Sequence, residues 1–372
     1  MRTIRLLVMV EQLQRAAPGG IGTYVRGLVK GLDAIGPGDR PDFEVLASRP
    51  PGARRRPGPL AALGCPVRGS PLPGPLLTRA WDHGLLRAPR GFDVVHATSL
   101  STLEPGRAAL VATVHDLLWR RVPDAYPARG LAWHEAALRR ALRRSDRFVV
   151  PAEAVADDLH QAGAPRDAIS VIPMGSDHLP PPDLAAAGAL LSRLGVDGPF
   201  LLSVGTLEPR KNQARLIEAY GRVRARLPEP WPLVMVGPSG WGQRVKPGVG
   251  VVLAGSVSPP ELSALYTMAR LLAYVPLIEG FGIPPIEAMA LGAPVVASPL
   301  PSTAGAAFEV DPHDVESIAA GLLRVATDED ERSRLRSRGL ERSSELTWSA
   351  VARRHLAVWS EAVDLARDPS RG

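Results

Sequence analysis

Short and nearly continuous apolar runs recur along the chain, and each run is followed by a stretch whose apolar residues have helical spacing. The runs are Ile4–Val10, Phe43–Ala47, Val94–Ala97, Leu110–Val114, Phe148–Pro151, Ile169–Ile172, Phe200–Val204, Leu233–Val236, Val251–Ala254, Leu271–Val275 and Pro294–Ala297. Strands covered on both faces have this character, because neither face meets water. Their alternation with helices predicts an α/β fold with doubly wound parallel sheets.

The length of 372 residues predicts two domains, because it exceeds what one ordinary core accommodates. A break with three consecutive prolines falls in residues 179–198, and we interpret this segment as a linker. The predicted domains are residues 1–178 and residues 199–348. Residues 49–75 are dense in Pro, Gly and Arg, which favours a long surface excursion from the first domain.

Composition and charge narrow the class of protein. The single cysteine, Cys65, precludes an internal disulfide, and no apolar stretch approaches the roughly 20 residues of a membrane span. The first ten residues favour a buried strand over a signal peptide, so we expect a cytoplasmic protein. A net charge of +6 suits phosphorylated ligands, anionic lipid or nucleic acid. Nucleic acid is disfavoured, because no zinc or helix-turn-helix signature is present.

Peripheral contact with the inner face of a membrane is a weaker hypothesis. It rests on four arginines, Arg139, Arg140, Arg143 and Arg144, which fall on one predicted helix. Such a helix could touch anionic lipid or a phosphorylated acceptor. The simpler interpretation is a solvated helix face, and the sequence favours it.

Two loops of the first domain follow strands and carry polar or glycine residues. Gly19–Tyr24 opens a helix, where glycines allow close approach of a ligand to the backbone, although a tight turn explains them equally well. Val25 stands where a dinucleotide fingerprint needs a third small residue, which disfavours a nicotinamide dehydrogenase. In Thr113–Asp116, His115 either faces a cleft or belongs to a helix-capping turn. His96 carries the same ambiguity with less support.

The loop Gly205–Asn212 joins the first strand of the second domain to a helix that we expect to begin near Asn212, with Asn212 as its N-cap. Arg210 and Lys211 then lie where a diphosphate would meet a helix N-terminus. Two fixed cations there could stabilise a leaving diphosphate. The alternative is an exposed basic pair without a ligand.

The segment Glu279–Glu287 follows the apolar run that ends at Val275. Pro285 suits the first position of a helix, so Glu287 is predicted in its first turn and Glu279 in the preceding loop. Two carboxylates can accept hydrogen bonds from the hydroxyls of sugar and ribose rings. The alternatives are a capping-box role for Glu287 and a solvated loop charge for Glu279.

The segment Glu279–Glu287 resembles the glutamate–seven–glutamate motif of glycosyltransferase family 4, which has the GT-B fold. Other motifs match the same family in the same order. They are Gly19–Gly22, Thr113–Asp116, Val150–Glu153, Ile172–Gly175, Gly205–Asn212, Gly237–Gly242, and Gly255–Val257 followed by Glu261, Leu262 and Tyr266. The resemblance extends from about Ile4 to about Leu365 and is strongest to a bacterial mannosyltransferase-like branch.

The resemblance implies two Rossmann-like domains facing across a cleft, an N-terminal acceptor domain and a C-terminal donor domain. A C-terminal helix at about 349–366 would pack back on the first domain. Arg210 and Lys211 would bind the donor diphosphate, Glu279 the transferred sugar, and His115 would lie at the reaction centre. The other implied donor-binding residues are Gly20, Gly22, Gly205, Thr206, Ser256, Val257, Gly280, Phe281, Gly282 and Glu287.

The implied reaction is transfer of a hexose from a nucleoside-diphosphate sugar with retained anomeric configuration and without a protein nucleophile. Mannose and GDP-mannose are favoured from the branch, with a UDP-sugar as the alternative donor. We expect no cofactor and no metal site, since no Asp-x-Asp ends a strand. No motif in the sequence indicates whether the acceptor is a glycan, a lipid-linked molecule or a small molecule. No motif indicates the oligomeric state either.

One departure from the family lies beside the glutamate motif. After Ala297–Ser302 the family continues with a Pro-Glu-containing stretch, whereas Thr303–Gly305 follows directly here. This shortened segment, residues 302–305, keeps open a second hypothesis, a catalytically silent partner or scaffold protein. A sugar-nucleotide epimerase is a third, but it needs acid–base residues that we cannot assign.

Overall fold

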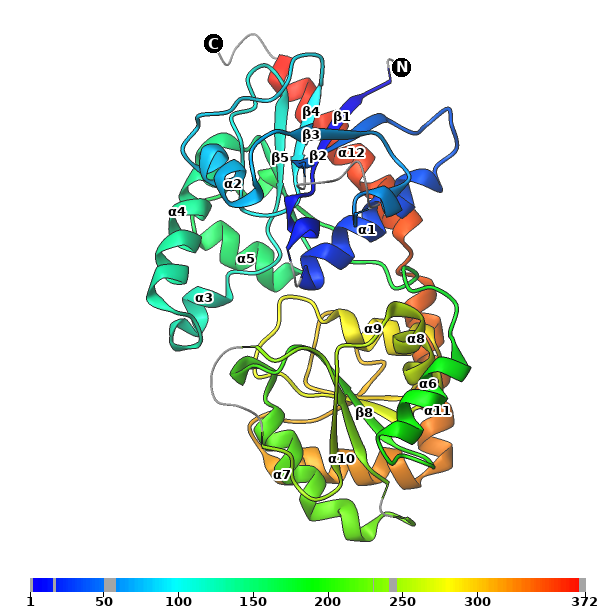
Figure 1. The fold of residues 1–372 in the computed structure, drawn as a ribbon. Coiled ribbons are helices and arrows are strands. Elements are labelled where there is room, and N and C mark those ends of the chain that lie inside the picture. The colour runs from blue at the N-terminus through cyan, green and yellow to red at the C-terminus, as the bar shows by residue number, and fades with distance from the viewer. Residues whose placement is uncertain (1–2, 16–17, 50–57, 230, 241–245, 368–372) are drawn as a thin grey trace. The chain divides into compact units, whose positions relative to one another are not determined.

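The computed structural model describes residues 3–15, 18–49, 58–229, 231–240 and 246–367. The chain forms two compact units (Figure 1). Unit 1 comprises Met1–His178 together with Trp348–Gly372, and unit 2 comprises Leu179–Thr347. Unit 1 is therefore discontinuous in sequence, whereas unit 2 is one uninterrupted stretch.

Unit 1 contains a parallel sheet of seven strands in the order β3-β2-β1-β4-β5-β6-β7. The strands are β1 (Arg5–Met9), β2 (Asp42–Ser48), β3 (Val67–Ser70), β4 (Val94–Ala97), β5 (Ala109–Thr113), β6 (Arg147–Val150) and β7 (Ile169–Val171). Helices cover the sheet, and the central strands β4 and β5 are buried along their whole length. This confirms the doubly wound parallel architecture predicted from the apolar runs.

Strand β3 corrects the prediction that residues 49–75 form only an irregular surface excursion. Its four residues pair in parallel with Val45–Ser48 at the edge of the sheet. An edge strand needs no apolar side chains on both faces, so Val67-Arg68-Gly69-Ser70 gave no apolar run. The same region also contains the start of α2 (Gly74–Asp82). Residues 50–57 lie outside the described part of the chain.

The first and the last helix of unit 1 pack against each other. The helices of unit 1 are α1 (Gly19–Asp33), α2, α3 (Leu118–Arg121), α4 (Ala128–Arg144), α5 (Glu153–Gln161) and α12 (Trp348–Arg367). At the start of α12 the buried indole of Trp348 lies directly against Gly27 of α1: a Cβ at Gly27 would lie 2.0 Å from Trp348 Cε2. Only glycine allows α1 and α12 to approach this closely.

A buried chain of hydrogen bonds joins α12 to α1 and the sheet. His355 Nδ1 bonds the carbonyl of Val351 at 2.8 Å, so its Nε2 carries no proton and accepts from the Tyr24 hydroxyl at 2.8 Å. The Tyr24 oxygen then accepts from Thr113 Oγ1 at 2.9 Å, and Thr113 accepts from His96 Nε2 at 2.8 Å. Burial lowers the pKa of both histidines, and with both rings neutral each proton in this chain takes one position.

Unit 2 contains a parallel sheet of six strands in the order β10-β9-β8-β11-β12-β13. The strands are β8 (Leu201–Val204), β9 (Leu233–Val236), β10 (Val251–Gly255), β11 (Leu271–Tyr274), β12 (Val295–Ala297) and β13 (Phe308–Glu309). The apolar runs predicted five of these strands. Strand β13 was missed, because a two-residue edge strand has no pattern to detect.

Residues 179–198 are not a linker, although unit 2 begins where the sequence predicts that the first domain ends. They belong to unit 2 and contain α6 (Leu184–Arg193), whose buried Ala187 and Leu191 join the core around β8. The Asp183 side chain caps this helix by accepting from the Ala186 amide at 2.9 Å. The prolines therefore lie directly after the boundary between the two units and precede a helix.

The other helices of unit 2 alternate with its strands or follow the last strand. They are α7 (Gln213–Val223), α8 (Pro259–Met268), α9 (Ile283–Ala290), α10 (Val315–Thr327) and α11 (Glu329–Ser344). Helix α10 packs on α7, and α11 packs on α9. The apolar faces of α7 and α10 share one buried core, whereas α6, α8 and α9 contribute to the core around β8 and β11.

The buried histidines predict a loss of stability in mild acid. Burial lowers the pKa of His355 to about 4, and burial also lowers the pKa of His96. In the unfolded chain both pKa values return to about 6.5. The unfolded state therefore binds more protons as the pH falls below about 6.5, and the folded state loses about 1.4 kcal/mol per pH unit for each histidine.

Urea unfolding at pH 7.5, 6.5 and 5.5, followed by tryptophan fluorescence, measures this dependence. His355→Gln should lower stability at pH 7.5 and flatten the dependence on pH, because one titrating group is removed. His313→Gln, at an exposed histidine of unit 2, should leave both unchanged. An identical acid dependence in the wild type and in His355→Gln would contradict the assignment.

Candidate functional site

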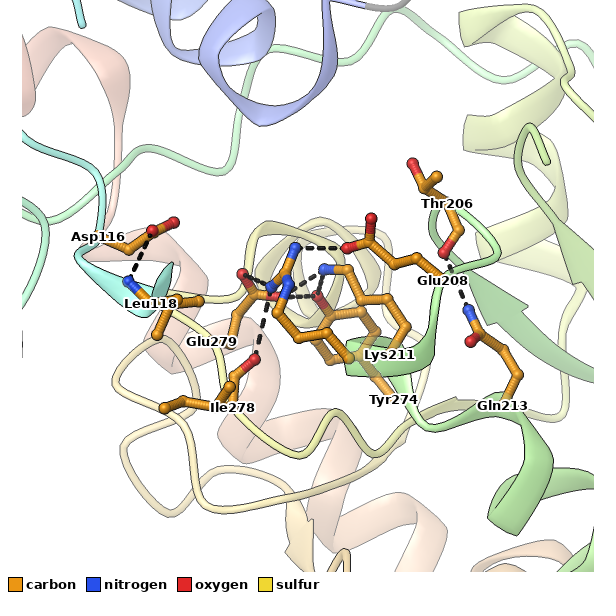
Figure 2. Close-up of polar contacts among 10 residues, drawn as sticks. Asp116, Leu118, Thr206, Glu208, Lys211, Gln213, Tyr274, Ile278 and Glu279 are labelled. Atoms are coloured by element: carbon orange, nitrogen blue, oxygen red, sulfur yellow. Dashed lines mark hydrogen bonds and ion pairs between the residues drawn. The ribbon is translucent and has the colours of Figure 1, made fainter. Parts of the chain in front are cut away.

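Polar side chains converge in unit 2 at the carboxyl ends of β8 and β11, the edge where open α/β sheets bind ligands (Figure 2). The loop after β8 contains Arg210 and Lys211, and the loop after β11 contains Glu279. A backbone hydrogen bond of 3.0 Å from the Leu277 amide to the Arg210 carbonyl joins the two loops. The residues predicted from separate motifs therefore form one cluster.

The cluster pairs two cations with two carboxylates. Arg210 donates from Nη1 to Glu279 Oε1 at 3.0 Å and from Nη2 to Glu208 Oε1 at 2.6 Å. The Lys211 ammonium pairs with Glu279 Oε2. The side chains of Arg210, Lys211 and Glu279 are each no more than 14% exposed. The formal charges cancel within the cluster, which is why two adjacent cations can be buried there.

Glu279 is ionised throughout the physiological range. Burial alone would raise the pKa of its carboxyl, but the charges of Lys211 and Arg210 outweigh burial and hold that pKa at about 2. The sequence left open a solvated loop charge for Glu279 and an exposed basic pair for Arg210 and Lys211. Their burial and mutual pairing contradict both of those alternatives.

Asn212 occupies the N-cap position of α7, as the sequence predicts, but its side chain does not cap the helix. It adopts a left-handed conformation with φ of 62°, and its side chain makes no capping hydrogen bond. Its Nδ2 instead donates to the carbonyls of Val275 at 3.0 Å and Pro312 at 2.7 Å. Asn212 thus ties the loop after β8 to the end of β11. Asparagine tolerates this backbone conformation better than most residues, which explains its presence.

Glu287 lies in the second turn of α9 rather than in the first, because the helix begins at Ile283. A capping box is excluded, since the N-cap residue is Gly282. Glu287 is 6% exposed, and the Tyr266 hydroxyl donates to its Oε2 at 2.7 Å. The sequence did not predict this contact, although Tyr266 was among the family matches.

The glycines around α9 keep the loop before it compact. Gly280 and Phe281 are buried, and Gly282 has φ of +97°. A Cβ at Gly282 would lie 2.9 Å from Ser302 Oγ in the shortened segment. Gly282 therefore meets both a steric and a conformational requirement for glycine.

The shortened segment 302–305 forms a tight turn whose first two residues are buried. Ser302 and Thr303 have no exposed surface, and Ala304 has φ of 43°. Arg342 of α11 donates to the Ser302 carbonyl at 3.1 Å. Left-handed backbone at Ala304 and the hydrogen bond from Arg342 thus hold this turn in place.

The remaining donor-loop residues predicted in unit 2 lie after β8 and β10. Gly205, after β8, has φ of +151°. A Cβ at Gly237, which follows β9, would lie 2.1 Å from the Gly205 carbonyl oxygen, so the loops after β8 and β9 are closely stacked. The Thr206 carbonyl accepts from Gln213 Nε2 at 2.9 Å. Ser256 and Val257 follow β10, immediately before α8. In the predicted segment Gly237–Gly242, Trp241 and Gly242 lie outside the described residues.

In unit 1, His115 lies in the loop after β5, and Gly20 and Gly22 lie in the first turn of α1. His115 Nε2 donates to the Thr98 carbonyl at 3.0 Å, which leaves Nδ1 without a proton. Burial lowers the pKa of His115 to about 4, so the ring is neutral at physiological pH. Asp116 accepts from the Leu118 amide at 3.2 Å, but the N-cap residue of α3 is Leu117, which makes no side-chain capping bond.

The structure decides two weaker hypotheses for unit 1. His96 is fully buried within β4 and bonds Thr113, so it is a core residue. Of the four arginines proposed to form a lipid-facing surface on α4, Arg140 pairs with Asp82 at 2.9 Å, and Arg144 pairs with Glu104 at 2.6 Å. Only Arg139 and Arg143 are exposed, so the predicted four-arginine surface does not form.

Unit 1 also has a cavity of about 530 Å3 between α3 and α5, lined by Leu117, Arg120, Arg121, Ala154, Asp157, Asp158 and Gln161. Arg121 pairs with Asp158 at 2.5 Å, and Arg120 pairs with Glu135 at 2.7 Å. Both arginines thus have a carboxylate partner, of which only Asp158 lines the cavity.

Sequence reasoning missed Glu208 and Tyr274. Glu208 is 3% exposed and holds Arg210, and the Tyr274 hydroxyl donates to Glu279 Oε2 at 2.7 Å. A signal for Tyr274 existed, because it is the one residue with a polar tip in the apolar run Leu271–Val275. Its position at the carboxyl end of a strand places that tip at the ligand-binding edge.

No helix among the described residues has the length and apolar character that crossing a bilayer requires. No three His, Cys, Asp or Glu side chains within the described ranges are grouped so as to hold a metal ion.

Two family models match the chain. Residues 18–178 match the model described as Glycosyltransferase Family 4, and residues 192–342 match that described as Glycosyl transferases group 1. O-antigen chain mannosyltransferase B of Escherichia coli is 30% identical over 64% of this chain and 66% of its own length. MMP alpha-(1->4)-mannosyltransferase of Mycolicibacterium hassiacum is 28% identical over 93% of this chain and 95% of its own length. Serotype-specific mannosyltransferase WbdA of Escherichia coli is matched over only 22% of its length.

Solved structures share the fold over nearly the whole chain. HepE of Anabaena, in complex with UDP and glucose, has a TM-score of 0.71 at 19% identity and covers 96% of this chain and 100% of its own. Sucrose-phosphate synthase of Thermosynechococcus elongatus has a TM-score of 0.72 at 21% identity and covers 97% of this chain and 100% of its own. These likenesses confirm the predicted GT-B fold with two Rossmann-like domains.

Two substitutions at Asn212 separate its two roles. Asn212→Ala should cost roughly 2–4 kcal/mol, because it leaves two carbonyls without a donor and places alanine in a left-handed conformation. Asn212→Gly should cost about 1–2 kcal/mol less, since glycine relieves the conformational strain alone. Urea unfolding of both variants measures the difference. Equal losses would show that the backbone conformation contributes nothing.

Proposed function

The chain belongs to glycosyltransferase family 4, and from this premise we propose that it is a retaining glycosyltransferase that takes a hexose from a nucleoside-diphosphate sugar. The observation that carries the proposal is the cluster of Arg210, Lys211 and Glu279 at the carboxyl edge of the sheet in unit 2. A buried pair of cations at this edge suits a diphosphate, and a carboxylate beside it suits sugar hydroxyls.

Arg210 and Lys211 are proposed to act on the leaving group. When the bond between the sugar and the diphosphate breaks, negative charge builds up on the departing phosphate oxygen. Cations that are already fixed in a poorly hydrated site stabilise that charge without reorganising. Because two side chains supply this positive charge, we propose that transfer needs neither a metal ion nor a cofactor.

The contacts of Glu279 favour a reaction without a protein nucleophile. Its Oε1 accepts from Arg210, and its Oε2 accepts from Tyr274 and Lys211. A carboxylate with both oxygens engaged by charged or polar donors is a weak nucleophile. We therefore propose that Glu279 orients the sugar, and that the acceptor attacks from the face that the leaving group vacates, with retention.

The other predicted residues take supporting roles in this proposal. Glu287 would bind the ribose, with Gly205, Thr206, Ser256, Val257, Gly280, Phe281 and Gly282 forming the rest of the donor loops. His115 is neutral and has an unprotonated Nδ1, so at the reaction centre it would accept a hydrogen bond from a substrate hydroxyl rather than act as an acid. Gly20 and Gly22 would allow a ligand to approach the start of α1 closely.

Mannose is the proposed sugar, and GDP-mannose the proposed donor. The similarity to O-antigen chain mannosyltransferase B and to MMP alpha-(1->4)-mannosyltransferase supports mannose. The UDP-glucose bound to HepE keeps UDP-sugars as the alternative donors. We assign acceptor binding to unit 1 and donor binding to unit 2, with a glycan, a lipid-linked molecule or a small molecule as the acceptor. A cytoplasmic location belongs to the same proposal.

The second candidate is a catalytically silent relative that serves as a partner or scaffold protein. The shortened segment 302–305 favours it. The intact cluster of Arg210, Lys211 and Glu279 opposes it, because a silent protein has no need for two buried cations at this edge.

Hydrolysis of the donor in the absence of an acceptor tests the proposal directly. The purified chain should release GDP from GDP-mannose, and the sugar first released should keep its anomeric configuration, as NMR can show. Lys211→Ala and Glu279→Ala should each lower the rate about 100-fold, the usual effect of removing one stabilising donor or its partner. GDP should also raise the melting temperature of the wild type by mass action.

Arg222→Ala is the matched control, because Arg222 is an exposed arginine of unit 2 paired with Glu218 and Glu316. Its rate should equal that of the wild type. Turnover of UDP-sugars alone would correct the donor. Absence of both turnover and thermal shift across GDP- and UDP-sugars would favour the silent relative.

A further inference from the structure

Tyr274 is the last residue of β11 and lies directly beneath the cluster (Figure 2). Its side chain is buried, with 4% of the residue exposed. Its hydroxyl has two partners, because Lys211 Nζ donates to it at 2.7 Å and it lies 2.7 Å from Glu279 Oε2. The Lys211 ammonium also lies over the Tyr274 ring, 5.1 Å from its centroid. One side chain therefore contacts both the cation and the carboxylate.

The direction of these hydrogen bonds is fixed by chemistry. An ammonium only donates, so the Tyr274 oxygen accepts from Lys211 and its own proton goes to Glu279. Burial and the neighbouring Glu279 charge raise the pKa of Tyr274 well above its usual range, which keeps the hydroxyl protonated. Lys211, Tyr274 and Glu279 thus form a closed triangle, since Lys211 also pairs with Glu279 directly.

The two cations differ in how firmly they are held. Arg210 has Glu208 as a second carboxylate partner at 2.6 Å and also donates to the Ile278 carbonyl at 3.4 Å. Among the described residues, Lys211 has polar contacts with Glu279 and Tyr274 only. If Glu279 turned towards a sugar, Lys211 would keep Tyr274 as its one neutral partner. The neutral Tyr274 hydroxyl would then hold the Lys211 ammonium in place without neutralising its positive charge.

We propose that Tyr274 is a positioning residue for transfer, which keeps Lys211 aimed at the donor phosphate while Glu279 exchanges its partners. The inference rests on the proposed function, and it adds a residue that no sequence motif supplied. A neutral hydroxyl suits this role, because it orients the ammonium and leaves its positive charge available to the phosphate. A carboxylate in the same place would cancel that charge.

Tyr274→Phe removes only the hydroxyl and preserves the ring beneath Lys211. We expect the rate of GDP-mannose hydrolysis at saturating donor to fall about tenfold or more, the loss expected when a hydrogen bond to a charged group is removed. The affinity for GDP, measured by thermal shift, should change less than about threefold, because Lys211 keeps its charge.

Tyr220→Phe is the matched control for loss of a buried tyrosine hydroxyl in unit 2. Tyr220 is fully buried, and its hydroxyl bonds the carbonyls of Trp231 at 2.8 Å and Gly250 at 3.2 Å. The melting temperature of Tyr220→Phe should fall about as much as that of Tyr274→Phe, but the turnover of Tyr220→Phe should equal that of the wild type. Equal turnover losses in the two variants would overturn the positioning role.

A double-mutant cycle with Lys211 identifies the path of the effect. In a Lys211→Ala background, Tyr274→Phe should reduce turnover less than about twofold, because the side chain to be positioned is gone. Additive losses would show that Tyr274 acts independently of Lys211 and would overturn the inference.

The reactivity of Lys211 provides a readout that needs no turnover. The chain has only three lysines, Lys30, Lys211 and Lys246, so reductive methylation can be followed at each by peptide mass spectrometry. Methylation of Lys211 relative to the exposed Lys246 should be about threefold or more faster in Tyr274→Phe than in the wild type, and unchanged in Tyr220→Phe. An unchanged ratio would overturn the inference. If the methylation ratio changes as expected but the wild type does not turn over the donor, the proposed function would be overturned instead.

Discussion

Two adjacent buried cations can exist in unit 2 only because carboxylates neutralise them. Arg210 and Lys211 would repel each other and lose hydration without Glu279 and Glu208 beside them. Glu279 comes from a different loop than the cations, so the requirement for neutrality also brings together the loops after β8 and β11. Asn212 reinforces the same junction through the carbonyl of Val275. The pairing of these charges thus holds the two loops of the site together.

Much of the fold was predictable because burial on both faces leaves a clear trace in the sequence. Central strands such as β4 and β5 need apolar residues at every position, and these runs were found. The edge strands β3 and β13 face fewer neighbours and escaped detection. The prolines before helix α6 predict a linker, whereas its own Ala- and Leu-rich sequence is typical of a helix. The errors therefore fall where burial is lowest or where local signals conflict.

The candidate site was predictable in its members but not in its contacts. Spacing after a strand placed Arg210, Lys211 and Glu279 in loops at one edge, and the resemblance to a family joined them. No local pattern shows that Asn212 takes a left-handed backbone conformation or that its amide reaches Pro312, a hundred residues away. Likewise, Tyr274 looked like one more residue of a buried strand. Contacts of this kind depend on tertiary structure, which spacing alone does not encode.

The discontinuity of unit 1 has a consequence for biosynthesis. Its closing helix, α12, is made only after the whole of unit 2, because it follows residue 347 in the chain. Until that helix emerges from the ribosome, Gly27 of α1 lacks the indole of Trp348, and Tyr24 lacks the imidazole of His355. Unit 2 can therefore fold while unit 1 is still incomplete. Until α12 is added, unit 1 exposes an apolar face to chaperones or to other nascent chains. The order of domain completion is then the reverse of the order in which the two units begin to be translated.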